Sequence, residues 1–475
     1  MVDNDREILL QIIKSLTEQN AALTARIDEL IQKLDEKNHK KNSKNSSVPP
    51  SQEGYAKPAP KSRRKPSGAK PGGQNGHDGS SMKLMKAPDE IRVYNPEPCA
   101  NCPNRACCHP TIAERRYETD IVVQTRLVEH RQMVCCCPKA DNVKLAGVFP
   151  QNITGTKQYG SNLKGLAVAL STVGMVSVDR IHKLLTSVFD ITVSAGTVQN
   201  WIGQMADSVT DAVSCIREKV FELPVLNCDE TGLRVAGSLH WLHCMCNEKW
   251  SYMELHKKRG KKAMEDIGLL PSFSNTMIHD FWKPYYSNEA ARHGLCNAHI
   301  LRELVYAEEE KHQVWAKQMQ ELLLEILDSR EQYAAMGQTC FQEGILEAYL
   351  LRYDRIVADG LSQNPVPRKP SWKRGRIAKG KVVCLLERLR DYKGDILLFA
   401  RDWQVPFTNN EAERTIRFSK VKQKVSGCFR TKEGADDYMK IMSFLSTARK
   451  QGVTWFQAVQ QAMNGNALTL AAQWT

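Results

Sequence analysis

The sequence predicts a multidomain protein of the α+β class, and three observations support this prediction. The chain has 475 residues, which is enough for three or four domains. Its composition changes along its length, from an N-terminal heptad repeat through a basic, proline-containing stretch to clustered cysteines. Beyond Pro224, short runs typical of strands give way to long runs typical of helices. We therefore expect several small modules in front of a mixed α/β core.

The chain carries a formal net charge of +13 and a pI near 9.0, which favours polyanions as partners. Nucleic acid is the expected partner. A membrane surface is the alternative, but the most apolar stretch, residues 163–178, contains Lys164 and is too short to cross a bilayer. The acidic start of the sequence differs from a secretory signal, so we expect a cytoplasmic protein with no membrane partner.

Residues 5–38 are predicted to form a coiled-coil leucine zipper. Apolar residues recur every seven positions, in one set at Leu9, Leu16, Leu23 and Leu30 and in another at Ile13, Ile27 and Leu34. Asn20 occupies the remaining position of the second set, where a buried Asn sets register and oligomeric state. This pattern predicts a parallel homodimer, or a higher homo-oligomer, formed through the coiled coil. The alternative is an amphipathic helix that packs on its own chain.

Residues 39–90 are predicted to be a basic linker rich in Pro, Ser and Gly. Between residues 40 and 70 there are nine Lys or Arg residues and a single acid, Glu53. Several prolines prevent helix formation, so we expect an extended arm that follows DNA. A solubilising spacer is the alternative. The expected DNA contacts in this arm are Lys61, Arg63, Arg64 and Lys65.

Residues 91–150 are predicted to form a zinc-knuckle-like β segment. Fifteen cysteines are present, and they cluster at residues 99–108 and 135–137, which indicates reduced thiols and a metal site rather than a disulfide framework. Residues 121–127 alternate like a strand. The expected Zn²⁺ ligands are Cys99, Cys102, Cys135 and Cys137, with Cys107, Cys108 and His109 as alternatives. A degenerate knuckle without metal is the competing interpretation.

Residues 158–206 are predicted to form a helix-turn-helix DNA-binding domain. The sequence indicates helices over 160–174, 177–189 and 194–205, the last one capped by Ser194. That last helix would enter a major groove, with Thr197, Gln199 and Asn200 facing DNA. Helices in ordinary packing often have similar spacing. The basic arm that precedes this segment in the sequence therefore strengthens its interpretation as a DNA-binding domain.

Residues 222–299 are predicted to be the first part of an RNase H-like catalytic core. Strands are expected at 225–235, 240–246 and 250–256, then a helix within 257–270 and a strand at 275–280. Asp229 lies within the first strand and Asp280 ends the fourth, and these positions are adjacent in such a sheet. Two adjacent carboxylates can share two divalent ions in phosphoryl transfer, and oxygen ligands favour Mg²⁺ or Mn²⁺.

A third carboxylate is expected from a helix near residue 410. Glu411 and Glu413 both lie at its start, and Thr408 or Asn409 would cap it. Glu413 shares one helical face with Ile416 and Lys420, which favours it over Glu411.

Several motifs together resemble the transposase family of insertion sequence 66. They are Asp229-Glu230-Thr231, His279-Asp280, Cys296-Asn297-Ala298-His299 with Arg302, and Asn409-Asn410-Glu411-Ala412-Glu413-Arg414. The resemblance covers nearly the whole chain, including the zipper and the linker, and it assigns the third acid to Glu413. The Cys135-Cys136-Cys137 run departs from the family's second cysteine pair. The resemblance also implies a mainly helical insertion over residues 300–400, the last core helices over 401–450 and a helical tail over 451–475.

The resemblance implies a DDE transposase that binds insertion-sequence ends, cleaves them and joins them to target DNA. Asp229, Asp280 and Glu413 would hold Mg²⁺ or Mn²⁺, and His299 would support them. Terminal inverted repeats, target DNA and small accessory proteins of the same element are the implied partners, in the nucleoid of a bacterial cytoplasm. Further DNA contacts are expected from Arg302, Arg374, Arg376, Arg414, Arg417 and Lys420. The alternatives are a nuclease that does not join ends and an inactive DNA-binding regulator.

Overall fold

The structure is a computed structural model that describes a defined part of the chain. The described residues are 13–24, 26–27, 87–94, 111–119, 121, 123–137, 143–150, 152–268, 270–366 and 379–474. The predictions for the basic arm with Lys61, Arg63, Arg64 and Lys65, for Cys99 and Cys102, and for Arg374 and Arg376 lie outside these residues.

Residues 13–24 and 26–27 are helical, as the heptad repeat predicts. The core positions Ile13, Leu16 and Leu23 are more than half exposed in the single chain. Apolar side chains at these positions are available to a second helix, so the dimer stays a prediction.

A short hairpin follows, formed by antiparallel strands β1 (Val134–Cys137) and β2 (Val143–Ala146). Cys135 lies in β1 and is exposed. The strand prediction for residues 121–127 is wrong for those of them that the structure describes, since none belongs to a strand. An alternating sequence forms a strand only where a neighbour pairs with it, and in this segment the pairing is confined to β1 and β2.

Three helices confirm the helical prediction for residues 160–205. They are α3 (Ser161–Thr172), α4 (Val178–Phe189) and α5 (Ala195–Ser208), and a further helix, α6 (Thr210–Phe221), follows them. Ser194 caps α5 as predicted, because its Oγ accepts a hydrogen bond of 3.0 Å from the backbone N–H of Thr197. Buried residues of these helices share one hydrophobic core with the sheet described next.

The central sheet has five strands in the order β5-β4-β3-β6-β7. Strands β3 (Val225–Val235), β4 (Ser238–Cys246) and β5 (Ser251–His256) form an antiparallel meander. Helix α7 (Lys261–Ile267) leads to β6 (Thr276–His279), which runs parallel to β3, and β7 (Arg292–Leu295) runs parallel to β6. The predicted sequence of three strands, a helix and a fourth strand is therefore confirmed.

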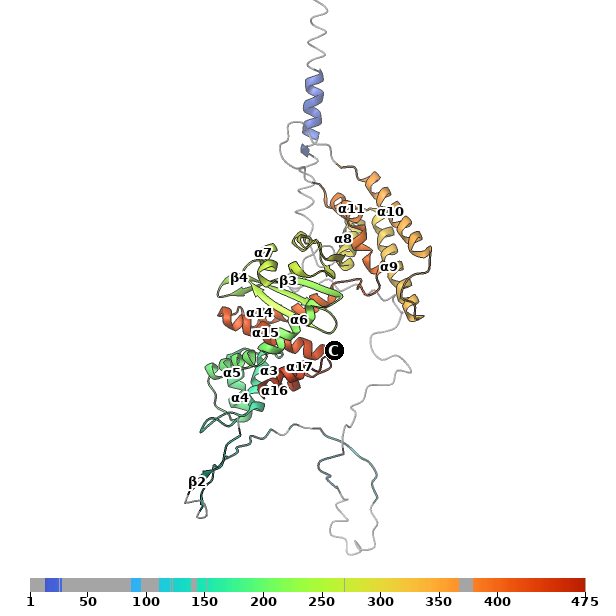
Figure 1. The fold of residues 1–475 in the computed structure, drawn as a ribbon. Helices are drawn as coiled ribbons and strands as arrows, with labels where there is room; N and C mark the ends of the chain where they lie inside the picture. Colours follow the sequence, from blue (N-terminus) through green and yellow to red (C-terminus); the bar gives the residue numbers. More distant parts are fainter. Residues whose placement is uncertain are drawn as a thin grey trace, which may run out of the picture. The chain divides into compact units, whose positions relative to one another are not determined.

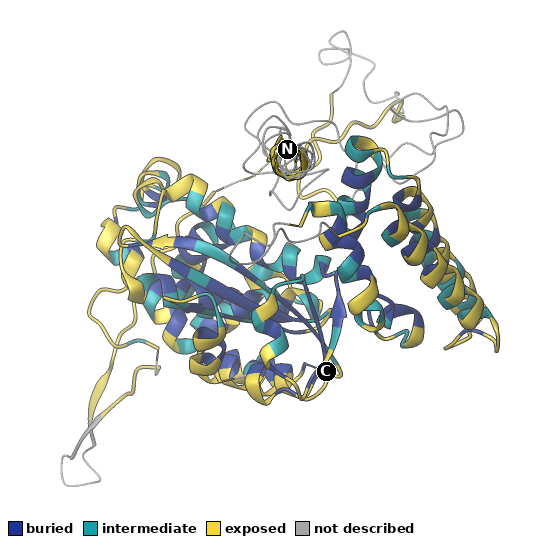
Figure 2. Cartoon of the chain, turned by 90° about the horizontal axis from the view of Figure 1, so that it is seen from above, coloured by how far each residue is buried: buried dark blue, intermediate teal, exposed yellow. Residues whose placement is uncertain are grey.

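Helices α14 (Asn410–Ser426) and α15 (Lys432–Lys450) pack on one face of this sheet (Figure 1). Alternate residues of the strands, among them Leu233, Leu242 and Met253, form a core with the two helices. The intervening side chains, such as Leu226 and Cys228, lie on the opposite face of the sheet and belong to the core that includes α7. Figure 2 shows the strands as the most deeply buried part of this region.

The predicted insertion over residues 300–400 is mainly helical where the structure describes it, as expected. It comprises α8 (Asn297–Lys311), α9 (Val314–Ala335), α10 (Ile345–Gln363), α11 (Lys381–Asp391), α12 (Lys393–Ile396) and α13 (Leu398–Arg401). These helices have a core of their own that also takes in Ile278 and Leu295 of the sheet. The tail forms α16 (Trp455–Met463) and α17 (Ala467–Ala471). None of the described helices is long and apolar enough to cross a membrane.

We predict that Gly360→Ala destabilises the protein. Gly360 lies inside α10, and an added Cβ would lie 2.5 Å from Leu386 and 3.0 Å from the Trp315 ring. Overpacking of this kind costs about 1–3 kcal/mol, more than the gain in helix propensity of about 1 kcal/mol. Chemical denaturation measures the change. Gly203→Ala is the matched control, because Gly203 lies inside α5 with no atom within 4 Å of its added Cβ, so this variant is expected to be neutral or more stable.

Candidate active site

Asp229 lies within β3, and Asp280 directly follows the neighbouring strand β6. Strands β3 and β6 are parallel, and Asn227 pairs with Ile278. Continuing this register by two residues brings Asp229 opposite Asp280, the residue that follows β6, and the charge of Asp280 raises the pKa of Asp229. The register alone thus brings together the first two predicted acids.

Glu413, in the first turn of α14, faces this pair from the helix. Burial raises the pKa of Asp229 well above its usual range, and the charges of Glu230, Asp280 and Glu413 raise it further. Burial likewise raises the pKa of Glu413, which Arg302 and Arg417 lower and Asp280 raises. The three predicted acids therefore form one electrostatically coupled group.

Glu411, the alternative third acid, is occupied elsewhere. Its carboxylate forms an ion pair of 2.9 Å with Lys450 at the end of α15. The same ammonium group donates a hydrogen bond of 2.6 Å to the backbone carbonyl of Asn247. The placement of Glu413 agrees with the helical-face argument, and Glu411 helps to hold α14 on α15.

The buried side chain of Asn409 fixes the start of α14 on strand β3. Its Oδ1 accepts a hydrogen bond of 2.9 Å from Asn227, and its Nδ2 donates one of 2.6 Å to the carbonyl of Cys228. Its backbone N–H donates to Cys296 Sγ at 3.2 Å. Asn409 occupies the predicted cap position but makes no side-chain capping bond, because its amide is used to bind the strand.

An open cavity of about 210 Å³ adjoins this group of acids. It is lined by Asp280, Phe281, Trp282, Leu295, Cys296, His299, Ile300, Glu303 and Arg388. Arg388 comes from α11 of the helical insertion, and its guanidinium pairs with Glu303 at 2.8 Å and lies 4.3 Å from the centre of the Phe281 ring. Its charge lowers the pKa of Asp280 and of His299. Sequence reasoning missed Arg388, since no local pattern links residue 388 to residue 280.

A second charged network lies on the other face of β3. Glu230 is buried there, accepts hydrogen bonds from Arg259 at 2.6 Å and 2.9 Å, and accepts one from the Tyr285 hydroxyl at 2.6 Å. The Arg259 guanidinium lies 4.8 Å from the Trp241 ring centre and 4.2 Å from that of Trp282. Arg259 also lowers the pKa of Asp280, so this network offsets part of the acidic charge.

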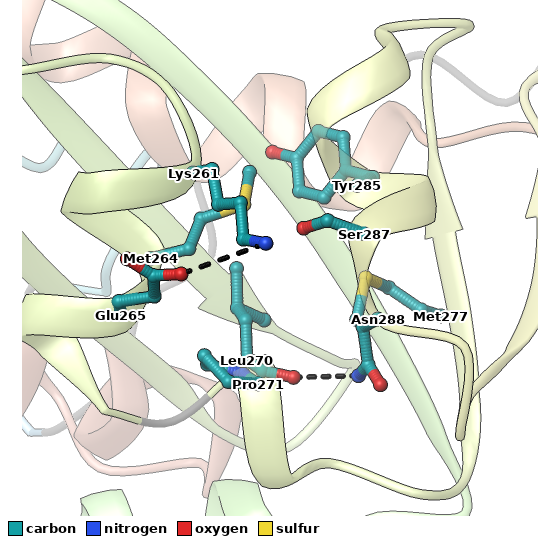
Figure 3. A pocket seen from close by; sticks show the side chains of 9 residues that line it. All are labelled: Lys261, Met264, Glu265, Leu270, Pro271, Met277, Tyr285, Ser287 and Asn288. Carbon is teal, nitrogen blue, oxygen red and sulfur yellow. Dashed lines mark hydrogen bonds and ion pairs between the residues drawn. The ribbon is translucent and has the colours of Figure 1, made fainter.

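Figure 3 shows a smaller cavity, about 40 Å³, on this second face. Lys261 and Glu265 of α7 face each other across 3.8 Å at its edge, and Asn288 donates to the carbonyl of Leu270 at 2.6 Å. The ring of Tyr285 lines it, while the hydroxyl of the same residue binds Glu230. A space of this size accommodates little more than a water molecule, so we place no substrate there.

The expected DNA contacts differ in their surroundings. Arg414 and Arg417 are exposed on α14, and Gln199 and Asn200 are exposed on α5, whereas Thr197 is half-buried beside its cap. Arg302 is half-buried and donates to the carbonyl of Ala298 at 3.2 Å. Lys420 donates to the carbonyl of Gly232, so its ammonium group secures α14 to the sheet.

Residues 157–437 match the sequence profile of the transposase family of insertion sequence 66, described as "Transposase IS66 family", and this match covers more than half of the chain. The chain belongs to the IS66 family of transposases. The resemblance drawn from the sequence motifs is thereby confirmed. Residues 4–83 match a second profile, a family of unknown function (DUF6444). No curated protein gives a significant match to the chain.

Membership in a transposase family implies a DNA substrate, DNA cleavage and a divalent metal ion. The ligand type of the three predicted acids suits such an ion. Asp229, Asp280 and Glu413 supply only carboxylate oxygens, and their raised pKa values show that, without a counter-charge, the ionised forms are unfavourable.

We predict that Asp229→Asn raises the melting temperature of the metal-free transposase at neutral pH. A carboxyl whose pKa is raised by folding keeps its proton up to a higher pH in the folded state than in the unfolded state. Its contribution to stability therefore falls as pH rises from the ordinary carboxyl range of about 4 towards the raised value. The neutral amide of the variant does not lose stability in this way. The difference in melting temperature between variant and wild type is therefore expected to grow between pH 5 and pH 8.

Mn²⁺ is expected to raise the melting temperature of the wild type more than that of Asp229→Asn, because the ion relieves the same repulsion. Glu248→Gln, which changes an exposed acid, is the control and is expected to behave as the wild type. A lower melting temperature for Asp229→Asn at pH 8, with the fold intact, would contradict this account of the site.

Proposed function

We propose that this IS66-family protein is a DDE transposase that cleaves insertion-sequence ends and joins them to target DNA with Asp229, Asp280 and Glu413. The observation that supports the proposal is the parallel register of β3 and β6, which when continued by two residues brings Asp229 opposite Asp280, while the charge of Glu413 in α14 also acts on Asp229. The strand order β5-β4-β3-β6-β7, three antiparallel strands followed by two parallel ones, supports an RNase H-like core.

The reaction consists of two in-line displacements at phosphorus. Water attacks the phosphodiester at the element's end, the bond from phosphorus to the 3′-oxygen breaks, and a 3′-hydroxyl is released. That hydroxyl then attacks a target phosphodiester, forms a new bond to phosphorus and displaces the target's own 3′-oxygen. Divalent ions held by the three acids would activate the attacking oxygen and stabilise the leaving one.

The chain's own residues provide the geometry for both steps. Asn409 and Lys420 hold α14 on β3, so Glu413 keeps its place relative to Asp229. Arg388 is positioned at the cavity wall, where a guanidinium can bind phosphate oxygens as charge develops. His299 lies 3.8 Å from Glu413, and burial lowers its pKa to about 4, so it acts as a neutral group beside the acids.

The remaining modules belong to the same proposal. The coiled coil predicted for residues 5–38 would pair two protomers so that two ends are held together. The segments over 39–90 and 91–150, with Zn²⁺ on Cys99, Cys102, Cys135 and Cys137, would bind the terminal repeats together with α5. Arg414 and Arg417, exposed on the helix that carries Glu413, suit contacts with the phosphates next to the cleaved bond.

We predict that Asp229→Asn and Glu413→Gln abolish joining of labelled element ends to a target plasmid in Mn²⁺. In each variant the new side chain is close in shape to the native one. Binding of the element ends, measured in a mobility-shift assay, is therefore expected to persist. Glu411→Gln is the matched control, since Glu411 pairs with Lys450 and is expected to retain joining. Cleavage without joining by the wild type would favour a nuclease, and binding without any metal-dependent chemistry would favour a regulator.

We predict that Arg388→Ala slows end cleavage by about 10²-fold or more, the usual loss when one charge-stabilising donor is removed. Arg388→Lys is expected to recover part of that rate. The matched control is Arg390→Ala on the same helix, whose guanidinium is exposed and pairs with Asp391. Single-turnover cleavage at saturating DNA measures the effect. Equal rates for the two alanine variants would show that Arg388 makes no phosphate contact.

A further inference from the structure

Three side chains beside the carboxylate pair have ligand atoms of a different kind. Cys296 directly follows β7, His299 lies in the first turn of α8, and Glu413 lies in the first turn of α14. The thiol sulfur, an imidazole nitrogen and a carboxylate oxygen of these residues all lie within 4.8 Å of one another. Cys296 and His299 both line the open cavity that contains Asp280.

Two of these ligand atoms have unmet hydrogen-bonding capacity. His299 Nδ1 and Glu413 Oε1 are inaccessible to solvent, and neither has a hydrogen-bond partner among the described residues. They face each other at 3.8 Å, which is too long for a direct hydrogen bond. With bonds of 2.0–2.3 Å, two ligands of one tetrahedral zinc ion lie roughly 3–4 Å apart, so this gap has the size that a bridging metal ion needs.

We infer that Cys296, His299 and Glu413 form a binding site for a divalent transition metal ion of the Zn²⁺ or Co²⁺ type. Three protein ligands of sulfur, nitrogen and oxygen suit such ions, and a fourth position would open into the cavity. The site deepens the proposed function and rests on it for the role of Glu413, which it shares.

The contacts around each ligand agree with this assignment. Cys296 Sγ accepts a hydrogen bond of 3.2 Å from the backbone N–H of Asn409, a contact that orients a sulfur ligand and stabilises its negative charge. Asn409 also holds α14, so the sulfur and the glutamate are fixed by one residue. Oε1 of Glu413 is the oxygen in contact with His299, and a carboxylate has a second oxygen that could serve the ions held by Asp229 and Asp280.

The two sites differ in the ions they prefer. Asp229 and Asp280 offer oxygen alone and suit Mg²⁺ or Mn²⁺, whereas the sulfur and the imidazole favour the softer ion. An ion at Cys296 and His299 would hold Glu413 in place while magnesium exchanges at the carboxylate pair.

Co²⁺ is the probe that tests the site, because a bond from sulfur to cobalt gives a charge-transfer absorption band. The full-length chain carrying Cys99→Ser and Cys102→Ser, which removes the first cysteine pair, would be titrated with Co²⁺ in the presence of Mg²⁺. We expect a saturable band whose dissociation constant rises by about tenfold or more in Cys296→Ser and in His299→Gln. Asp229→Asn is the matched control and is expected to change that constant by less than about twofold, since ligand loss alone gives the larger effect.

Serine keeps an acceptor for the Asn409 N–H, and circular dichroism checks that Cys296→Ser is folded. Should that variant fail to fold, His299→Gln carries the test alone. The inference is overturned if no cobalt band forms, or if the dissociation constant is the same in Cys296→Ser and His299→Gln as in their parent. It is also overturned if Asp229→Asn weakens cobalt binding as much as these two variants do. Strand-transfer assays on the same preparations separate the two proposals. If the cobalt band forms but no ends are joined, the metal site stands and the proposed function fails.

Discussion

The hydrogen bonds of Asn409 are the constraint on which the geometry of the site depends. Asp229 and Asp280 are brought together by strand register, which involves neighbouring backbones and needs no further support. Glu413 arrives from a helix far along the chain, and helix packing alone would leave it free to slide by a residue. The Asn409 amide removes that freedom by binding both the Asn227 side chain and the Cys228 carbonyl, while its own N–H binds Cys296. Every one of these groups is buried, so a shift of α14 would leave several polar atoms unsatisfied.

This geometry gathers like charges, and the surrounding structure offsets them only in part. Arg259, held between two tryptophan rings, neutralises Glu230 behind the strand, and Arg388 lies at the cavity wall in front. The pKa of Asp229 nevertheless stays raised, chiefly through burial. A buried group of carboxylates is unfavourable when ionised, and a bound cation would relieve that repulsion.

Local sequence patterns predicted the parts of this arrangement that depend on local physics. Alternation located β3 and its Asp229, the end of β6 located Asp280, and Ser194 marked the start of α5. Alternation failed at residues 121–127, where the described residues have no pairing strand. Arg259 and Arg388 were missed because each reaches the acids through tertiary packing, and neither belongs to a motif with recognisable spacing. The choice between Glu411 and Glu413 came from the helical face and the family resemblance, and the Glu411–Lys450 ion pair gives it a physical reason.

The helical insertion has a structural part in the site besides supplying Arg388. The loop between α13 and α14 is held by Arg330 of α9, which donates to the carbonyls of Phe399, Trp403 and Val405. The backbone N–H of Asn297, at the start of α8, donates to the carbonyl of Phe407 in the same loop. Two residues after Phe407 the chain reaches Asn409 and its hydrogen bonds to β3. The insertion therefore contacts the segment that leads into α14 through both α8 and α9, and its folding contributes to the position of the third acid.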